Sequence, residues 1–234
     1  MSKKLLLISN SICYGKGYLD HCAEEIVDYL GEIKDILFVP YALHDRDWYA
    51  NLARERFNKM GIKLTSIHRA RNPENKVKKG SSIFVGGGNT FRLLSELYRN
   101  GLIKIIQKKV NGGMPYIGAS AGANVACPTM KTTNDMPIVC PPSFDSLNLV
   151  KFNINPHYID SDPNTKHMGE TRDKRIEEFH EEDSTVVVGL REGSYIRIEN
   201  KNAKLKGKTG AKIFTKNKKP KEYKANSNLK FLLT

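Results

Sequence analysis

The chain has 234 residues, of which 39% are hydrophobic and 27% are charged. A chain of this length suits one sizeable domain, and this composition excludes a disordered or collagen-like protein. Its apolar runs are shorter than the roughly 18 residues that span a bilayer. The apolar run 5–8 is also too short for the core of a signal peptide. We therefore expect a cytoplasmic protein with no membrane partner.

The positive charge is concentrated near the C-terminus. The sequence carries a formal net charge of +13, and residues 201–234 hold eleven lysines against a single acid, Glu222. A basic protein is a candidate for nucleic-acid binding. This segment, however, has no arginine and no cluster of aromatic side chains on which bases would stack. We expect a solvated, lysine-rich edge of the fold and no nucleic-acid partner.

The four cysteines, Cys13, Cys22, Cys127 and Cys140, do not indicate a metal centre. They form no C-x-x-C pair, and none has a histidine at the spacing of a zinc site. Reduced, mostly structural thiols are therefore expected.

The first half of the chain alternates short apolar runs with amphipathic segments. In chain order, these patterns predict strands over residues 4–9, 35–39, 63–67, 82–85 and 115–118, and helices over 19–30, 45–60, 90–98 and 102–111. This rhythm is typical of an α/β fold, a doubly wound and mostly parallel sheet with helices on both faces. In such folds the chemistry gathers at the carboxyl ends of the strands.

The rhythm changes after residue 125. Residues 127–165 are rich in Pro, Asn and Asp and predict long connections, followed by a helix over 171–180 and a strand over 185–190. The alternating segments 194–199, 201–206 and 211–216 predict short antiparallel strands at the C-terminal edge of the sheet. Because no repeat or linker interrupts the chain, residues 1–234 are predicted to form a single domain.

A candidate nucleophile lies in the segment from Gly118 to Gly122, which matches G-x-S-x-G. This pattern forms a tight turn that presents a serine at the top of a sheet, and here it follows an apolar strand and precedes a helix. The alternative interpretation is a glycine-rich helix start with a capping serine. The context favours Ser120 as a nucleophile.

A second glycine cluster, residues 86–90, also lies between a strand and a helix. A phosphate-binding loop is one interpretation, but the spacing of dinucleotide and P-loop motifs is absent. Next to a serine elbow, the cluster is better interpreted as half of an oxyanion hole. One backbone N–H would come from this loop near Gly88 and the other from Ala121, both directed at the developing negative charge.

A serine nucleophile needs a base to accept its proton. Of the six histidines, His157 is the best candidate because it follows an alternating stretch at an expected strand end. His21 and His180 fall on predicted helices and are expected at the surface. The loop histidines His44, His68 and His167 are weaker alternatives.

Two acids compete to orient the imidazole. Asp135 gives the chain order Ser, Asp, His, whereas Glu192 gives Ser, His, Glu. Chain order does not decide, because the same geometry arises from several orders. Glu192 directly follows a predicted strand, and this position favours it as the third member. The alternative role for Asp135 is to cap a turn or to fix the nucleophile loop.

Several motifs together resemble the peptidase E family of serine peptidases, the alpha-aspartyl dipeptidases. This family is related in fold to class I glutamine amidotransferases and to cyanophycinase. The matching segments are residues 86–90, 118–123, 132–138, 155–157, 169–172 and 190–193, and the pattern over 8–11 extends the match.

The resemblance implies a class I glutamine amidotransferase-like, flavodoxin-like fold and a cytoplasmic enzyme, monomeric or homodimeric, without metal or cofactor. It implies hydrolysis of small peptide substrates, the Asp-X dipeptides, through an acyl-enzyme on Ser120. His157 would be the base, and both Asp135 and Glu192 fall on acids that the family offers as third member.

Arg172 and Asn89 lie in matched motifs and are the candidates for substrate binding. A fixed guanidinium pairs with a carboxylate through two parallel hydrogen bonds, which suits an aspartyl side chain. An exposed arginine at a helix start is the competing interpretation of Arg172.

Two other functions compete with the dipeptidase. One is a cyanophycinase-like peptidase that cuts aspartyl polymers, which the cationic segment 201–234 would favour. The other is a non-catalytic, amidotransferase-like binding module, which the presence of serine, histidine, acids and oxyanion glycines disfavours.

Overall fold

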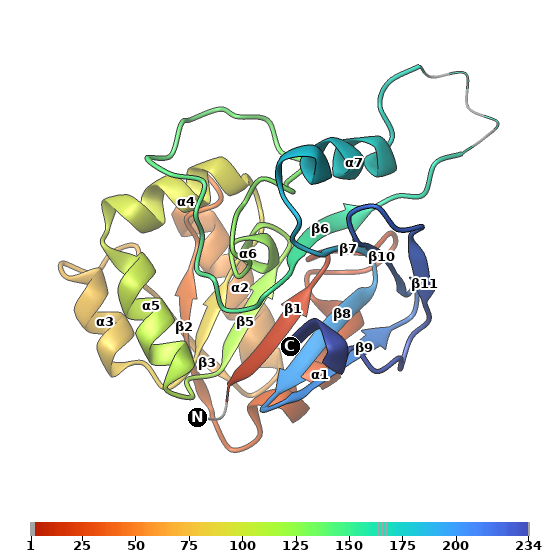
Figure 1. The fold of residues 1–234 in the computed structure, drawn as a ribbon. Coiled ribbons are helices and arrows are strands. Elements are labelled where there is room, and N and C mark those ends of the chain that lie inside the picture. Colours follow the sequence, from red (N-terminus) through yellow and green to blue (C-terminus); the bar gives the residue numbers. More distant parts are fainter. Residues whose placement is uncertain (1–2, 163, 165, 167, 234) are drawn as a thin grey trace.

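The computed structural model describes residues 3–162, 164, 166 and 168–233, and its strands form two sheets (Figure 1). The larger sheet has seven strands in the order β3-β2-β4-β5-β1-β8-β9. Its first five strands are mutually parallel, and β8 and β9 add to the β1 edge in antiparallel register. The strands are β1 Lys4–Ile8, β2 Asp35–Val39, β3 Lys63–Ser66, β4 Ile83–Val85, β5 Tyr116–Ala119, β8 Ser194–Glu199 and β9 Asn202–Gly207.

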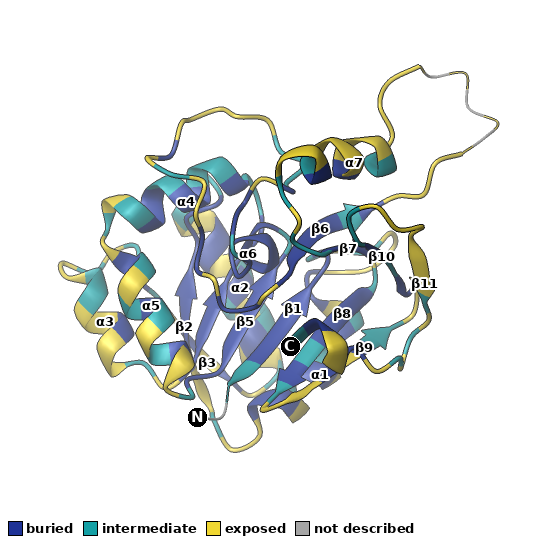
Figure 2. Ribbon diagram, viewed as in Figure 1, coloured by how far each residue is buried: buried dark blue, intermediate teal, exposed yellow. Residues whose placement is uncertain are grey.

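Helices cover both faces of this sheet. Leu6 and Ile8 of β1 pack with the apolar faces of α1 (Ala23–Leu30) and α2 (Arg46–Lys59). The alternating residues Leu5 and Leu7 pack on the other face with α3 (Pro73–Lys79), α4 (Thr90–Arg99) and α5 (Leu102–Asn111). Figure 2 shows the buried strands between these two layers. The apolar runs in the sequence are continuous because both faces of the strands are buried.

The second sheet has four strands in the order β11-β10-β7-β6. Its strands are β6 Asn153–Tyr158, β7 Val187–Arg191, β10 Ala211–Phe214 and β11 Lys221–Tyr223. The helix α7, Arg172–Glu182, packs Ile176 into a small cluster with Tyr158, Val187 and Phe214.

Several details of the fold differ from the sequence prediction: strand β11 was not predicted, and β6 lies within the segment 127–165 that was expected to form connections. Segment 211–216 was expected at the edge of the main sheet, but β10 pairs with β7 in the second sheet. An alternating strand gives the same signal in either sheet, so the pattern alone could not make this choice. Helix α3 was not predicted because Val77 is its one buried residue; Asn72 caps it and Pro73 occupies its first turn.

The lysine-rich segment 201–234 is part of the fold. It contains β9, β10 and β11, a final 3-10 turn Lys230–Leu233, and the buried side chains Leu229 and Leu232. Most of its lysines are exposed. In the described part of the chain, no helix is both long and apolar enough to cross a membrane.

Candidate active site

Ser120 occupies a strained turn between β5 and the short helix α6, Ala121–Asn124. Its φ of 53° and ψ of −112° are unusual for a residue with a side chain. A Cβ at Gly122 would lie 2.0 Å from the carbonyl oxygen of Val85, and one at Gly118 would lie 2.4 Å from the carbonyl oxygen of Gly122. The turn therefore requires both glycines, and it leaves the Ser120 side chain partly exposed at the carboxyl edge of the sheet.

The imidazole of His157 reaches Ser120 from the second sheet. His157 lies near the end of β6 with a φ of 51°, and its Nε2 is 2.7 Å from Ser120 Oγ. Its Nδ1 is 2.6 Å from Glu192 Oε1. The three side chains thus form a continuous hydrogen-bonded chain from nucleophile to acid, the arrangement that activates a serine.

Glu192 lies in the turn between β7 and β8, and two polar side chains, the buried Asn10 and the exposed Thr209, hold this turn. The following residue, Gly193, has a φ of 81°, and its N–H donates to Asn10 Oδ1 at 2.8 Å. The hydroxyl of Thr209 donates to the Glu192 carbonyl oxygen at 2.5 Å. About half of the Glu192 side chain remains exposed to solvent. Its backbone is therefore fixed while its carboxylate faces the imidazole at the rim of the site.

Asp135 does not reach the imidazole. Its Oδ2 accepts hydrogen bonds from the backbone N–H of Thr90 at 2.7 Å, from Thr90 Oγ1 at 2.5 Å and from Thr133 Oγ1 at 3.1 Å. The carboxylate holds the start of α4, directly after the glycine cluster, and Glu192 occupies the Nδ1 position of His157. Sequence order could not separate the two acids because each lies far along the chain from His157.

The glycine cluster lies against the nucleophile. A Cβ at Gly87 would be 3.0 Å from Ser120 Cβ. Gly88 has a φ of 131°, and a Cβ at this position would lie 2.8 Å from the carbonyl oxygen of Ala42. The buried hydroxyl of Tyr49 also lies against this loop, 2.4 Å from the position of a Cβ at Gly86. Among the described residues, the N–H groups of Gly88 and Ala121 donate to no acceptor, so both are available to a developing oxyanion.

A cavity of about 430 Å³ opens beside Ser120. Its lining combines apolar side chains with the polar groups described above. The lining residues are Ser11, Ile12, Tyr18, Leu43, Trp48, Tyr49, Leu52, Gly87, Gly88, Ser120, Asp135 and His157.

The two candidates for substrate binding differ in their surroundings. Asn89 caps α4 by accepting from the N–H of Arg92 at 3.0 Å, and its amide donates to Met136 O at 2.9 Å. Its polar side-chain atoms are therefore engaged in the protein. Arg172 begins α7 and is half-buried; burial lowers the pKa of its guanidinium, as does Arg175, whereas the nearby Asp135 carboxylate raises it.

A profile of peptidase family S51 matches residues 5–206 of the chain. The chain belongs to peptidase family S51. Peptidase E of Streptomyces coelicolor is 48% identical over 98% of this chain and 94% of its own length. The Drosophila melanogaster protein named "Probable alpha-aspartyl dipeptidase" is 43% identical over 99% and 98%. The resemblance to the peptidase E family that the sequence motifs indicated is thereby confirmed.

The crystal structure of a peptidase from an acI-B1 Actinobacterium has the same fold as this S51 peptidase. It superposes with a TM-score of 0.73 at 18% identity, covering 98% of this chain and 97% of the other. The α/β fold with a mostly parallel sheet and helices on both faces is confirmed.

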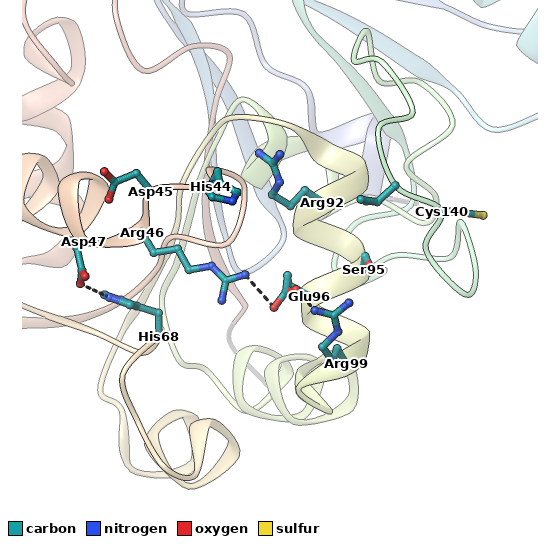
Figure 3. A pocket seen from close by; sticks show the side chains of 11 residues that line it. His44, Asp45, Arg46, Asp47, His68, Arg92, Ser95, Glu96, Arg99 and Cys140 are labelled. Carbon is teal, nitrogen blue, oxygen red and sulfur yellow. Dashed lines mark hydrogen bonds and ion pairs between the residues drawn. The ribbon is translucent and has the colours of Figure 1, made fainter.

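The S51 peptidase has a larger cavity, of about 860 Å³, at a different place (Figure 3). Several of its charged side chains are paired with one another: Arg46 Nη2 lies 3.1 Å from Glu96 Oε2, and His68 Nε2 lies 2.8 Å from Asp47 Oδ1. The residues around it are His44, Asp45, Arg46, Asp47, His68, Arg92, Ser95, Glu96, Arg99, Val139 and Cys140. This lining includes neither a glycine cluster nor the Ser120 elbow.

Beside this larger cavity lies a second serine–histidine–acid chain. Ser66 Oγ is 2.6 Å from His68 Nδ1, and the opposite ring nitrogen contacts Asp47. Both oxygens of Asp47 are also bound by Arg69, and these hydrogen bonds lower the pKa of Asp47 to about 2. Because Ser66 ends an ordinary strand rather than a strained elbow, this chain is a surface hydrogen-bond network.

The remaining histidines differ partly from expectation. His180 was expected at the surface, but it is 8% exposed and its Nε2 bonds the carbonyl oxygen of Thr185 at 3.0 Å. Both ring nitrogens of His21 are also buried. His44 is exposed at the larger cavity, and His167 lies outside the described residues.

Sequence reasoning did not assign roles to Ser9 and Asn10, which are both fully buried. Ser9 bonds the backbone of His157, and Asn10 bonds that of Gly193. Two polar residues directly after a buried strand were the available signal, because a buried polar side chain needs partners.

Proposed function

We propose that this S51 peptidase is a serine dipeptidase that hydrolyses Asp-X dipeptides. The names of its relatives, peptidase E and alpha-aspartyl dipeptidase, support this substrate class. The observation that carries the chemistry is the hydrogen-bonded chain from Ser120 through His157 to Glu192 at a strained elbow. Because the site combines Ser120 from the larger sheet with His157 from the second sheet, we propose that the chain forms one catalytic domain.

In the proposed mechanism, Ser120 Oγ attacks the carbonyl carbon of the Asp-X bond while His157 Nε2 takes the hydroxyl proton. Glu192 accepts the hydrogen bond of Nδ1–H and stabilises the imidazolium that forms. The N–H groups of Gly88 and Ala121 bind the oxyanion, a contribution for which loss of one donor typically costs about 100- to 1000-fold in rate. His157 then protonates the departing amine, and water repeats the cycle on the acyl-enzyme.

Arg172 is proposed to bind the side chain of the substrate aspartate. It is half-buried, and no side-chain hydrogen bond joins it to the other described residues, so its donors are free for a carboxylate. A partly desolvated guanidinium gains more from a carboxylate partner than an exposed one does. Asn89 supports the site indirectly, since it fixes the start of α4 beside the glycine cluster.

The proposed function is tested by hydrolysis of Asp-Leu, Glu-Leu, Ala-Leu and isoaspartyl-Leu. We expect cleavage of Asp-Leu, much weaker cleavage of the other three, and loss of activity in Ser120→Ala. The Ser66→Ala variant is the matched control, because it removes the other serine that is bonded to a histidine. If the wild-type enzyme did not hydrolyse Asp-Leu, the proposal would be wrong.

A further inference from the structure

The strand that carries His157 is irregular at that residue. In the parallel pairing of β6 with β7, Asn155 lies opposite Gly189. The next pair is Tyr158 with Arg191, so β6 has two residues between these pairs where β7 has one. His157 is one of the two, and its φ of 51° is uncommon for a residue with a side chain. The extra residue forms a β-bulge, a feature that re-aims side chains beside active sites.

An ion-pair cluster lies directly after this bulge. The guanidinium of Arg191 binds both oxygens of Asp160, with Nε 2.7 Å from Oδ2 and Nη2 2.8 Å from Oδ1. It also binds both oxygens of Glu222 in β11, at 2.9 and 3.0 Å. Its Cζ lies 5.6 Å from the ring centroid of Tyr158. We call Arg191, Asp160 and Glu222 the arginine clamp.

The arginine clamp differs from an ordinary surface ion pair. An isolated exposed pair contributes little, because two flexible side chains must be held in one geometry. Here the arginine side chain is only 18% exposed, and its planar fork makes two hydrogen bonds to each carboxylate. The hydrogen bonds to Asp160 raise the pKa of Arg191, and the same contact lowers the pKa of Asp160. The clamp therefore joins the ends of β6 and β7 to β11, the edge strand of the second sheet (Figure 1).

The clamp lies next to both members of the histidine–acid pair in the sequence. Arg191 directly precedes Glu192, and Asp160 follows His157 by three residues. The contact of 2.6 Å between His157 Nδ1 and Glu192 Oε1 joins the same two strand ends. About half of the Glu192 side chain is exposed, so packing does not hold its carboxylate in place. The contact therefore depends on how the two strand ends are held relative to each other.

We propose that the arginine clamp positions the catalytic base. By closing the bulge of β6, it keeps His157 in contact with Glu192 and directed at the nucleophile. Arg191 is thus a positioning residue, which acts on the reaction through other residues. This inference rests on the proposed dipeptidase function. Through Glu222, which is its single acid, the lysine-rich segment 201–234 takes part in this role.

A purely structural role for the clamp predicts a different result. If Arg191 only stabilised the fold, its loss would lower the free energy of unfolding and leave the kinetics of the folded enzyme unchanged. Arg197 provides the comparison, because its side chain is also 18% exposed, binds three acids and places its Cζ 5.7 Å from the ring centroid of Tyr29. Its acids belong to α1 and β8, away from the Ser120 cavity.

The experiment compares Arg191→Lys with Arg197→Lys in the hydrolysis of Asp-Leu. Lysine keeps the positive charge but lacks the fork that binds two carboxylates at once. A difference between the two variants therefore reports geometry and not net charge. In Arg191→Lys we expect kcat to fall about tenfold or more with little change in KM, because small displacements of catalytic groups are costly. Arg197→Lys should lose stability and keep the kcat of wild type.

A second measurement is the pH dependence of kcat/KM, whose acidic limb reports protonation of the base. When Glu192 no longer faces the imidazole, the imidazolium is less stabilised. In Arg191→Lys the acidic limb should therefore move to lower pH, by about half a pH unit or more. The other ionisable groups nearby, Asp135 in the cavity and His21 within electrostatic range of Glu192, are the same in both enzymes. Arg197→Lys should keep the wild-type profile.

Asp160→Asn opens the clamp from its other side. Because this carboxylate is half-exposed, the variant should fold, and its kcat should fall as that of Arg191→Lys does. A wild-type kcat and acidic limb in Asp160→Asn, or equal changes in Arg191→Lys and Arg197→Lys, would overturn the positioning role while leaving the dipeptidase function intact. Failure to cleave Asp-Leu at all would instead refute the proposed function.

Discussion

The buried hydroxyl of Ser9 accepts a hydrogen bond from the backbone N–H of His157 at 3.0 Å. The same hydroxyl donates to the carbonyl oxygen of Leu190 in β7 at 2.7 Å. The preceding residue, Ile8, accepts a hydrogen bond from the N–H of Ser120 at 2.9 Å. The end of β1 therefore fixes the backbones of nucleophile and base, which come from different sheets.

Replacing Ser9 by alanine should release the backbone of His157 from the end of β1 without changing the reacting atoms. Since the N–H of His157 and the carbonyl of Leu190 would lose a buried partner, we expect a loss of about 1–3 kcal/mol in the free energy of unfolding. We also expect kcat to fall tenfold or more with little change in KM, because small displacements of catalytic groups are costly. Steady-state kinetics and urea unfolding measure both effects.

Ser82→Ala is the control for this variant. Ser82 is also fully buried, and its hydroxyl donates to Asp35 O at 2.8 Å, away from the Ser120 cavity. It should lose a similar amount of stability and keep its kcat. An equal fall of kcat in both variants would mean that Ser9 acts only through stability.

Glu192→Gln should lower kcat strongly. The amide keeps the size of the carboxylate but cannot stabilise the imidazolium by charge, and it can present an N–H to His157 Nδ1 and favour the wrong tautomer. Loss of the triad acid costs about 10⁴-fold in a buried triad. Glu192 is half-exposed, so we expect a smaller loss of about 100- to 1000-fold. Activity within a few fold of wild type would exclude Glu192 as the third member.

The glycines of the site should respond to alanine in different ways. In Gly122→Ala, the Cβ would lie 2.0 Å from the backbone oxygen of Val85, so we expect a severely destabilised protein. In Gly87→Ala, the nearest atom is Ser120 Cβ at 3.0 Å, so we expect a folded protein with little activity. Thermal unfolding and Asp-Leu hydrolysis distinguish these outcomes.

Gly80→Ala provides the matched control for both glycine variants. A Cβ at Gly80 would make ordinary contacts, the nearest at 3.5 Å from Lys76 O. This variant should be close to wild type in stability and activity. If Gly87→Ala were equally active, the close approach of the glycine cluster to Ser120 would not matter for catalysis.

The sequence predicted the features whose cause is local. Continuous apolar runs gave the parallel strands, and the strand-glycine-serine pattern gave the Ser120 elbow because that turn depends on adjacent glycines. The choice between Asp135 and Glu192 and the role of Ser9 depend on contacts between residues far apart in the chain. Ser9 and His157 are 148 positions apart, and no periodicity encodes such a pairing.

Buried thiols and phenols should make the protein sensitive to alkaline pH. Burial raises the pKa of Cys22 to about 12 and that of Tyr49 to about 12. In the unfolded chain these groups ionise near pH 8.5 and 10, respectively. Above those values the unfolded state binds fewer protons than the native state, so the free energy of unfolding falls as pH rises.

Between about pH 9 and pH 12, Cys22 alone should lower the free energy of unfolding by about 1.4 kcal/mol per pH unit. Below this range its contribution to stability is fully present. In Cys22→Ala we therefore expect the free energy of unfolding, measured with urea between pH 8 and pH 11, to fall less steeply by that amount. Cys140→Ala removes an exposed thiol and should retain the wild-type slope. If the slope of Cys22→Ala equalled that of wild type, the Cys22 thiol would not remain protonated in the native protein.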